Sequence, residues 1–335
     1  MNEAFAHYMA ILTMWELIGS KERHSRRRNP NEIPDIPDKN MFFFKKLNFR
    51  ARMNSIDGQG PLYSEGRAFA ETIIYVYNWG VMFVRMLEGT VGTENFQQAI
   101  KNYLNKYKHG NADHEQLFAE FEFVNPFKAN KTSISTIFNS WIKQKGVPLV
   151  KVSRCKETSS ICRPSRNQLL LQQIVFPGQG QFFDEPTQSP SLAVWYIPIH
   201  YALIRYENGM YSGIENHWFF MKNTKQPVIL SLPGIEENDF KSIAILNINY
   251  TGTYHVTYEE NEWKNIGSVM MENPDILPLV GRYQLFWSLQ TSVNRKEIKP
   301  YMMLCLGEYL KVYSFLCIFS NMLAYHLHHM IHVLI

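Results

Sequence analysis

Residues 135–154 read STIFNSWIKQKGVPLVKVSR, and the expected secondary structure changes within this stretch. A helix is expected to end at Gly146, because glycine is favoured just past a helix end and Pro148 follows closely. Beyond Pro148 apolar and polar residues alternate, which is typical of a strand. The stretch therefore predicts that a helical part of the chain gives way to a β part near residue 148.

The residues before this stretch carry apolar side chains at the three- to four-residue spacing of amphipathic helices. This spacing occurs in residues 73–87, in residues 96–107, and near the N-terminus at Phe5, Tyr8, Met9, Leu12 and Trp15. Residues 92–94, Gly-Thr-Glu, separate two of these helices. Residues 111–114 offer N-caps for a further helix that carries Leu117, Phe118 and Phe121.

The residues after this stretch form short apolar or alternating runs, separated by polar links rich in glycine and proline. The runs between residues 149 and 234 are PLVKVSR, NQLLLQQIVF, LAVWYIPIHYALI and QPVILSLPG. Their spacing predicts a small β-sandwich. The later run AILNINYTGTYHVTYEENEW predicts a hairpin with Thr251 and Gly252 at its tip, after which the pattern returns to helix.

The length and net charge of the chain exclude few classes of protein. The chain has 335 residues, 45% of them hydrophobic, which is enough for two or three domains with a sizeable core. Its 34 basic and 30 acidic residues are too balanced to indicate a nucleic-acid partner. The basic run KERHSRRR at residues 21–28 is interpreted as a solvated helix end rather than a phosphate-binding arm, because prolines follow it at residues 30, 34 and 37.

The cysteines fall into two local pairs, Cys155 with Cys162 and Cys305 with Cys317. A disulfide between Cys155 and Cys162 is plausible in an oxidising compartment, and two free thiols are a nearly equal alternative. Asn130 and Asn249 each begin an N-glycosylation sequon, which adds weak support for a secretory protein. No signal-peptide pattern opens the sequence.

Residues 310–325 are apolar but contain Lys311, Ser314, Ser320 and Asn321. They fall short of the roughly 20 apolar residues that cross a bilayer, so no transmembrane span is expected. A helix that is apolar on all sides needs a partner to bury it. We expect this end of the chain to pack against a larger body.

The order of motifs along residues 1–290 resembles that of the zinc aminopeptidases of the aminopeptidase N type. MNEAFAHYM resembles the "LNEGFA" helix of that family, YNWGVMFVRML at 77–87 resembles "YxKGaxvlrML", and NSWIKQKGVPLVKVSR resembles "xxWtxQxGxPvvxV". VWYIPIHY and TGTYHVTY resemble "WxIPlxy" and "tGyYRVnY". The resemblance implies a helical rear half of a thermolysin-like catalytic domain in residues 1–148, a small β-sandwich in 149–240, and the start of an α-helical C-terminal domain with a divergent tail in 241–335.

The resemblance also implies a zinc cofactor and peptide substrates. In that family zinc is held by the two histidines of an H-E-x-x-H helix and by the glutamate of "LNEGFA", while the glutamate inside H-E-x-x-H serves as general base. Glu3 matches the third-ligand position. Tyr77 matches the tyrosine that stabilises the oxyanion during peptide hydrolysis. The family's neighbouring lysine is Trp79 here, and the arginine of "YYRV" is His255, so both positions depart from the pattern.

Replacements for the two histidine ligands are not convincing. His114-Glu115 starts like H-E-x-x-H, but the fifth residue is Phe118, and the segment is interpreted as a helix N-terminus with an acidic first turn. His328 and His332 are spaced as a zinc pair, but His329 stands where the base glutamate would be, and a divergent terminus is the favoured interpretation. The "GAMEN" strand, which binds the substrate's free amine, is absent from the sequence.

These observations predict an aminopeptidase N-like family member that is catalytically incompetent as written, because one carboxylate cannot hold zinc. We expect no zinc bound by this chain alone and an exposed apolar face that a partner could cover. The alternative is a non-catalytic module that binds peptides or proteins. Members of the family are commonly ectoenzymes, so the resemblance implies the plasma membrane or the extracellular side.

Overall fold

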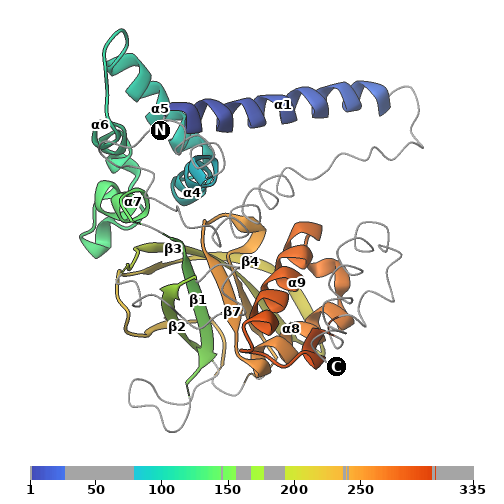
Figure 1. Ribbon diagram of the computed structural model, residues 1–335. Coiled ribbons are helices and arrows are strands. Elements are labelled where there is room, and N and C mark those ends of the chain that lie inside the picture. The colour runs from blue at the N-terminus through green and yellow to red at the C-terminus, as the bar shows by residue number, and fades with distance from the viewer. Residues whose placement is uncertain are drawn as a thin grey trace.

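The computed structural model describes residues 2–26, 79–144, 146–155, 167–176, 193–236, 239, 241–303 and 306. Helices form the first part, and two β-sheets with covering helices form the second (Figure 1). The chain is thus a mixed α and β protein, as expected. Its division into three domains stays a prediction.

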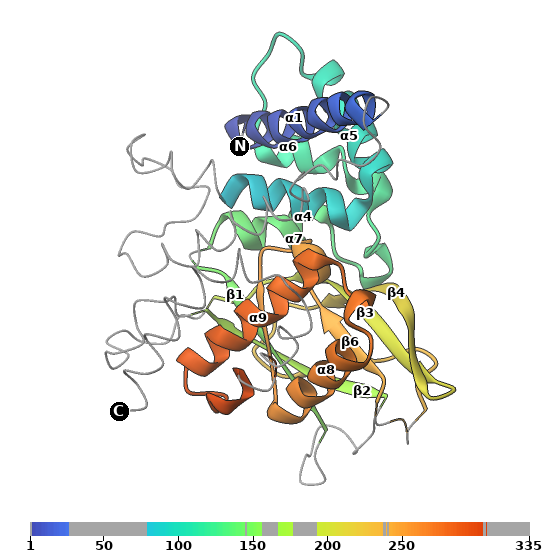
Figure 2. The same cartoon turned by 90° about the vertical axis from the view of Figure 1, so that its right-hand side faces the viewer.

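The helical part contains longer helices joined by short turns. These are α1 (Asn2–Arg26), α4 (Val81–Val91), α5 (Thr93–Lys106), α6 (His114–Ala119) and α7 (Ile134–Ile142), with the 3-10 turns η2 (Glu122–Val124) and η3 (Lys128–Asn130). Helices α1, α4 and α5 lie together at one end of the molecule, with α6 and α7 beside them (Figures 1 and 2). The helices expected near the N-terminus and at 96–107 are confirmed, and of the expected helix at 73–87 the part from residue 81 onward is confirmed.

The helix ends follow from local chemistry. Gly92 has φ 84° and lies between α4 and α5, so it ends one helix and precedes the next in a conformation that favours glycine. Asp113 caps α6 by accepting from the backbone N–H of Gln116, whose side chain accepts in return from the backbone N–H of Asp113. Ser133 caps α7 by accepting from the backbone N–H of Thr136.

Two sheets follow Gly146, which has φ 84°, as the sequence predicted. The strands are β1 (Pro148–Arg154), β2 (Gln168–Val175), β3 (Ile197–Glu207), β4 (Met210–Met221), β5 (Val228–Ser231), β6 (Ile243–Leu246) and β7 (His255–Tyr258). One sheet has the order β5-β2-β1-β7 and the other β4-β3-β6. Strands β1 and β7 pair in parallel, and the other pairs are antiparallel.

The hairpin expected around Thr251 and Gly252 is wrong. Strand β6 pairs with β3 and β7 pairs with β1, so the segment between them crosses from one sheet to the other. The crossing passes through η4 (Ile248–Tyr250), and the Asn247 side chain fixes it by donating to the carbonyls of Gly252 and Tyr254. The strands therefore continue to Tyr258, beyond the limit of residue 240 expected for the sandwich.

Strand β4 was not among the expected strands. It forms a hairpin with β3 in which Glu207 pairs with Met210, so Asn208 and Gly209 make the connection. Both residues have positive φ, 54° and 85°, as the Asn-Gly turn of a tight hairpin requires. This dipeptide was the sequence signal for β4.

Helices α8 (Glu260–Glu272) and α9 (Leu279–Asn294) follow β7, with η5 (Pro274–Ile276) between them (Figure 2). Helix α8 contacts β4 and β6, and α9 contacts β7 and η4. The prediction that helix follows Trp263 is correct, although the helix begins earlier than expected, at Glu260. Trp263 and Ile266 of α8 and Leu289 of α9 are fully buried.

Cys155 is disulfide-bonded, so the alternative of a free thiol at this position is wrong. Its expected partner Cys162 and the pair Cys305 and Cys317 lie outside the described residues. The apolar segment 310–325 lies outside them too. Among the helices that the structure describes, none is long and apolar enough to cross a membrane.

Candidate functional site

Glu3 lies in the first turn of α1 and is partly buried. Its neighbours Ala4, Tyr8 and Ile11 are buried and recur at the helical spacing that faces a core. Glu3 therefore lies beside the buried stripe of α1 rather than in it. A carboxylate at the border of a buried face is available to a ligand while its backbone is held by packing.

Aromatic side chains hold α1 in place. The Phe5 ring stacks on the Phe96 ring of α5 with centroids 6.1 Å apart, and Tyr8 meets the same Phe96 ring edge-on at 6.2 Å. The Tyr8 hydroxyl donates a hydrogen bond to the Glu88 carboxylate of α4. Burial and the neighbouring Glu88 carboxylate raise the pKa of Tyr8 far above its usual value, so the phenol stays protonated and remains a donor.

Arg85 connects α4 to the crossing between the two sheets. Its Nε donates to the Tyr250 carbonyl at 3.0 Å and its Nη2 donates to the Asn249 carbonyl at 2.9 Å. Gly89, one turn further along α4, permits the close approach, because a Cβ there would lie 2.4 Å from the Thr251 Cγ2. The helix that supports α1 is thus also fixed to the β part.

Sequence reasoning missed the roles of Tyr8, Arg85 and Glu88. Tyr8 and Arg85 both fall inside the motifs that carry the family resemblance, MNEAFAHYM and YNWGVMFVRML. The available signal was two charged residues, Arg85 and Glu88, in a mostly apolar helix. Its carbonyl partners lie about 165 residues further along the chain, so no local pattern identifies them.

The other predicted positions divide into two groups. Tyr77, the expected oxyanion-stabilising residue, lies outside the described residues. Trp79 and His255, which depart from the family pattern, are buried. The His255 ring lies between Phe176, at 4.2 Å, and Trp287, at 4.9 Å. His255 thus has a packing role in the β part.

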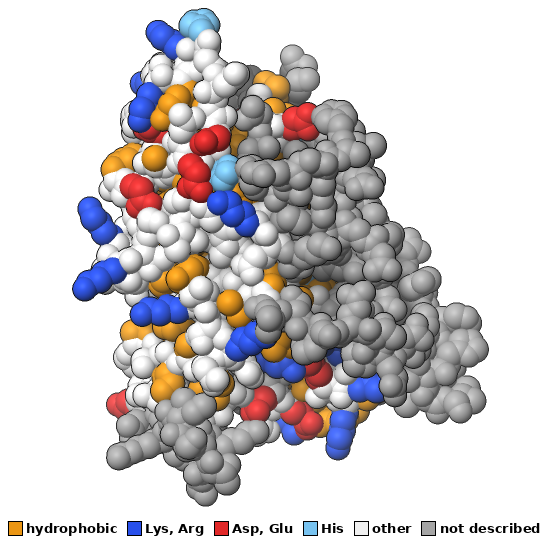
Figure 3. Space-filling view, turned by 60° about the vertical axis from the view of Figure 1, so that its left-hand side comes forward, with side chains coloured by type: hydrophobic (Ala, Val, Ile, Leu, Met, Phe, Trp, Pro, Cys, Tyr) orange, Lys and Arg blue, Asp and Glu red, His pale blue; other side chains and the backbone are white. Residues whose placement is uncertain are grey.

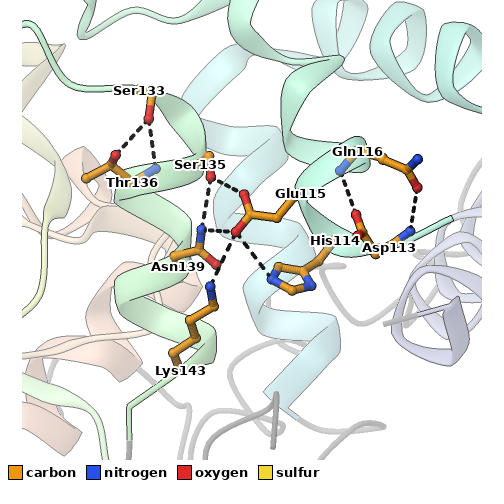
Figure 4. Close-up of polar contacts among 9 residues, drawn as sticks. All are labelled: Asp113, His114, Glu115, Gln116, Ser133, Ser135, Thr136, Asn139 and Lys143. Atoms are coloured by element: carbon orange, nitrogen blue, oxygen red, sulfur yellow. Dashed lines mark hydrogen bonds and ion pairs between the residues drawn. The ribbon is translucent and has the colours of Figure 1, made fainter. Parts of the chain in front are cut away.

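The His114-Glu115 pair lies at the start of α6 and faces α7 (Figure 4). The Glu115 carboxylate accepts hydrogen bonds from Ser135 and from Asn139 Nδ2, the latter at 2.8 Å, and pairs with Lys143 Nζ at 3.3 Å. The His114 Nε2 lies 3.5 Å from the same carboxylate. Glu115 is engaged in joining two helices, which confirms the interpretation of this segment as a helix N-terminus.

Glu115→Gln is expected to make the free energy of unfolding fall less steeply as the pH is lowered. Hydrogen bonds from Ser135 and Asn139 and the Lys143 charge lower the pKa of Glu115 below its usual value of 4.5. A lowered folded-state pKa adds stability above the unfolded pKa, and that stability is lost as pH falls through the folded pKa. Because Glu115 is half exposed, the effect should stay below about 1 kcal/mol.

Urea unfolding at pH 6.5 and at pH 3.5 measures this effect. The wild-type chain should lose more stability between the two pH values than the Glu115→Gln variant does. An exposed control, Glu94→Gln, should behave like the wild type. Equal losses in the wild type and Glu115→Gln would contradict the assignment.

The metal-binding capacity of the described part is limited. Among the residues that the structure describes, no three side chains of the His, Cys, Asp and Glu types are grouped as a metal site. His328, His329 and His332 lie outside this part. The residues around Glu3 therefore do not fit a zinc ion by themselves.

Comparison with known proteins gives the class to which this arrangement belongs. Residues 1–141, which hold Glu3, Tyr8, Arg85 and all of α7 except its last residue, match the model of the peptidase family M1 domain. The chain thus carries part of an M1 peptidase domain, followed by a β part.

The proteins that are similar to this chain include aminopeptidases from animals and a plant. The chain is 25% identical to aminopeptidase N of Rattus norvegicus over 217 residues, which is 62% of this chain and 19% of that protein. It is 29% identical to aminopeptidase M1-A of Oryza sativa subsp. japonica over 186 residues, 55% of this chain and 18% of that protein. It is 25% identical to glutamyl aminopeptidase of Homo sapiens over 203 residues, 59% of this chain and 18% of that protein.

Over residues 1–141 the chain is similar to the M1 peptidase family, and the relatives named above are all aminopeptidases. The chain spans about a fifth of the length of the relatives it matches.

Proposed function

We propose that this chain supplies the third zinc ligand and its supporting helices to an aminopeptidase that releases N-terminal amino acids from peptides. Glu3 would be that ligand, and Tyr77 would stabilise the oxyanion. The observation that supports the proposal best is the placement of Glu3 at the border of the buried face of α1, next to Ala4 and Tyr8. The helix is fixed by the Tyr8 bond to Glu88 on α4.

Residues 1–335 by themselves should be inactive under this proposal. They contain no H-E-x-x-H sequence, so the two histidine ligands and the general base would have to come from elsewhere. Zinc in such sites supplies an activated water and a Lewis acid. Together these contribute on the order of 8 kcal/mol or more to the rate enhancement of a hydrolase.

Exposed apolar side chains on α1 support the proposal that another protein segment covers this helix. Met9, Met14 and Leu17 of this helix are exposed large hydrophobic side chains. A contiguous exposed apolar surface is typical of a site that another protein segment covers. We propose that this side of α1 packs against the part of the enzyme that carries the remaining ligands.

The disulfide at Cys155 supports a location on the extracellular side of a membrane or outside the cell. Disulfides persist in oxidising compartments and are rare in the reducing cytosol. The location is part of the proposal and applies to the mature protein.

The test is an assay of purified residues 1–335 together with the Glu3→Gln variant. We expect neither protein to release the N-terminal residue from an aminoacyl-4-nitroanilide, and zinc content by mass spectrometry to be well below one equivalent in both. Adding a tethered segment that bears H-E-x-x-H should raise zinc content in the wild type and raise it less in Glu3→Gln. Turnover by residues 1–335 alone, or equal zinc uptake by both tethered proteins, would overturn the proposal.

A further inference from the structure

The sequence carries two N-glycosylation sequons, and the structure places them in opposite environments. Asn130-Lys131-Thr132 follows α6 in the turn that leads to α7, and Asn249-Tyr250-Thr251 forms the crossing between the two sheets. A sequon is used only where the asparagine amide can carry a bulky, hydrated oligosaccharide on the surface. The two sites can therefore be compared within one chain.

Asn130 meets the surface requirement. Its side chain is exposed, and among the described residues it makes no hydrogen bond. The Thr132 hydroxyl lies close by and donates to the Asn130 carbonyl at 3.2 Å. Figure 3 views the molecule from the side of α6 and α7, where acidic and basic side chains are scattered over the described surface.

The loop that carries Asn130 is held at its base, so exposure of this residue is a fixed property of the fold. The Phe127 ring stacks on Phe220 of β4 with centroids 4.5 Å apart. The Asn125 side chain donates to the Thr132 carbonyl at 2.8 Å. Lys131 adopts a left-handed conformation with φ 55°, which completes the turn between η3 and α7.

Asn249 fails the same requirement. The residue is only partly exposed, its side-chain oxygen is buried, and its neighbours Ile248 and Tyr250 are buried. Its carbonyl accepts from Arg85, which fixes the backbone against α4. An oligosaccharide on Asn249 would have to separate α4 from the crossing between the sheets.

We propose that Asn130 is an N-glycan attachment site and that Asn249 is not. In the reaction the Asn130 Nδ2 bonds to the anomeric carbon of an oligosaccharide carried on a lipid diphosphate. The bond from that carbon to the diphosphate oxygen breaks, and one amide proton passes to a base of the transferase. The disulfide at Cys155 agrees with this site, because disulfide formation and N-glycosylation share the secretory compartment.

The experiment is translation of residues 1–335, fused to a cleavable signal sequence from another protein, in the presence of microsomes. Wild type, Asn130→Gln, Thr132→Ala, Thr132→Ser and Asn249→Gln are compared by gel mobility before and after treatment with peptide N-glycosidase. We expect one glycan on the wild type, on Thr132→Ser and on Asn249→Gln, and none on Asn130→Gln or Thr132→Ala. Mass spectrometry of the treated wild type should find Asp at position 130 and Asn at position 249.

Each result decides the proposal without reference to the peptidase function, because a glycan is read directly on the chain. Persistence of the mobility shift in Asn130→Gln, or its loss in Asn249→Gln, would overturn it. An unshifted wild-type chain that is protected from added protease inside the microsomes would overturn it as well.

Discussion

Trp141→Ala is expected to lower the free energy of unfolding by about 3–5 kcal/mol, the range for removing a large aromatic side chain from a core. Trp141 lies in α7 and is fully buried. Its ring centroid is 6.2 Å from that of Trp195, and its Nε1 donates to the Tyr196 carbonyl at 2.7 Å. The substitution removes both the ring and the hydrogen bond, at the point where the helical part meets the strands.

Urea unfolding followed by far-UV circular dichroism measures this effect independently of tryptophan fluorescence. Phe123→Ala is the matched control, because Phe123 is an aromatic residue that is 58% exposed, and its loss should change stability by less than about 0.5 kcal/mol. If Trp141→Ala does not fold, Trp141→Phe keeps most of the volume and should still lose about 1–3 kcal/mol, because the Tyr196 carbonyl loses its donor. A change below 1 kcal/mol in both variants would contradict the packing described here.

Glu262→Ala is the second change with a large expected effect. Glu262 of α8 is 3% exposed and accepts from the Arg154 guanidinium of β1 through two bonds, 2.9 Å from Nε and 3.2 Å from Nη2. Removing the carboxylate leaves a largely buried cation without its main partner. Breaking one side of such a pair costs about 3–5 kcal/mol.

The pair can be tested by a double substitution. Glu262→Leu combined with Arg154→Met replaces both charges by apolar groups and should recover most of the loss, since an apolar pair of similar volume has no charge to desolvate. Glu272→Ala, an exposed acid at the end of the same helix, should change stability by less than about 0.5 kcal/mol. Equal losses in the single and the double variant would show that α8 is held by something other than this pair.

Local chemistry made much of the helical part predictable. Gly92 was expected to separate two helices, and it does so with φ 84°. Helix α7 ends at Ile142 rather than at the expected Gly146, although Gly146 also has φ 84°. Asp113 and Ser133 cap α6 and α7 through bonds to residues three positions further on. These features depend on neighbours within one turn, so the order of residues is enough to identify them.

In the β part, most strands could be predicted from the sequence, but which strands pair with one another could not. The strands β1, β2, β3 and β5 follow from alternating or apolar runs, whereas β4 does not alternate cleanly and was overlooked. The expected hairpin failed because β7 pairs with β1, about 105 residues earlier in the chain. A parallel pairing over that separation leaves no signal in the residues that connect the strands.

In the candidate site, too, some residues were identified from the sequence, whereas the contacts that hold them were not. Glu3 and Tyr77 were identified from motifs, and their ligand and oxyanion roles stay proposals. The bonds from Arg85 to the carbonyls of residues 249 and 250 were not foreseen. They depend on three left-handed residues in the crossing, Asn247, Asn249 and Tyr250, which turn those carbonyls toward α4.

The amino-acid sequence by itself determined the resemblance to the aminopeptidase family, most helix ends, the type of most strands and the choice of the candidate ligand. It did so because capping, glycine conformation and apolar periodicity act over a few residues. Only the tertiary structure decided which strands pair, which of the two sequons is exposed and what holds α1 in place. Those outcomes depend on contacts between residues far apart in the chain, which form only when the whole core is packed.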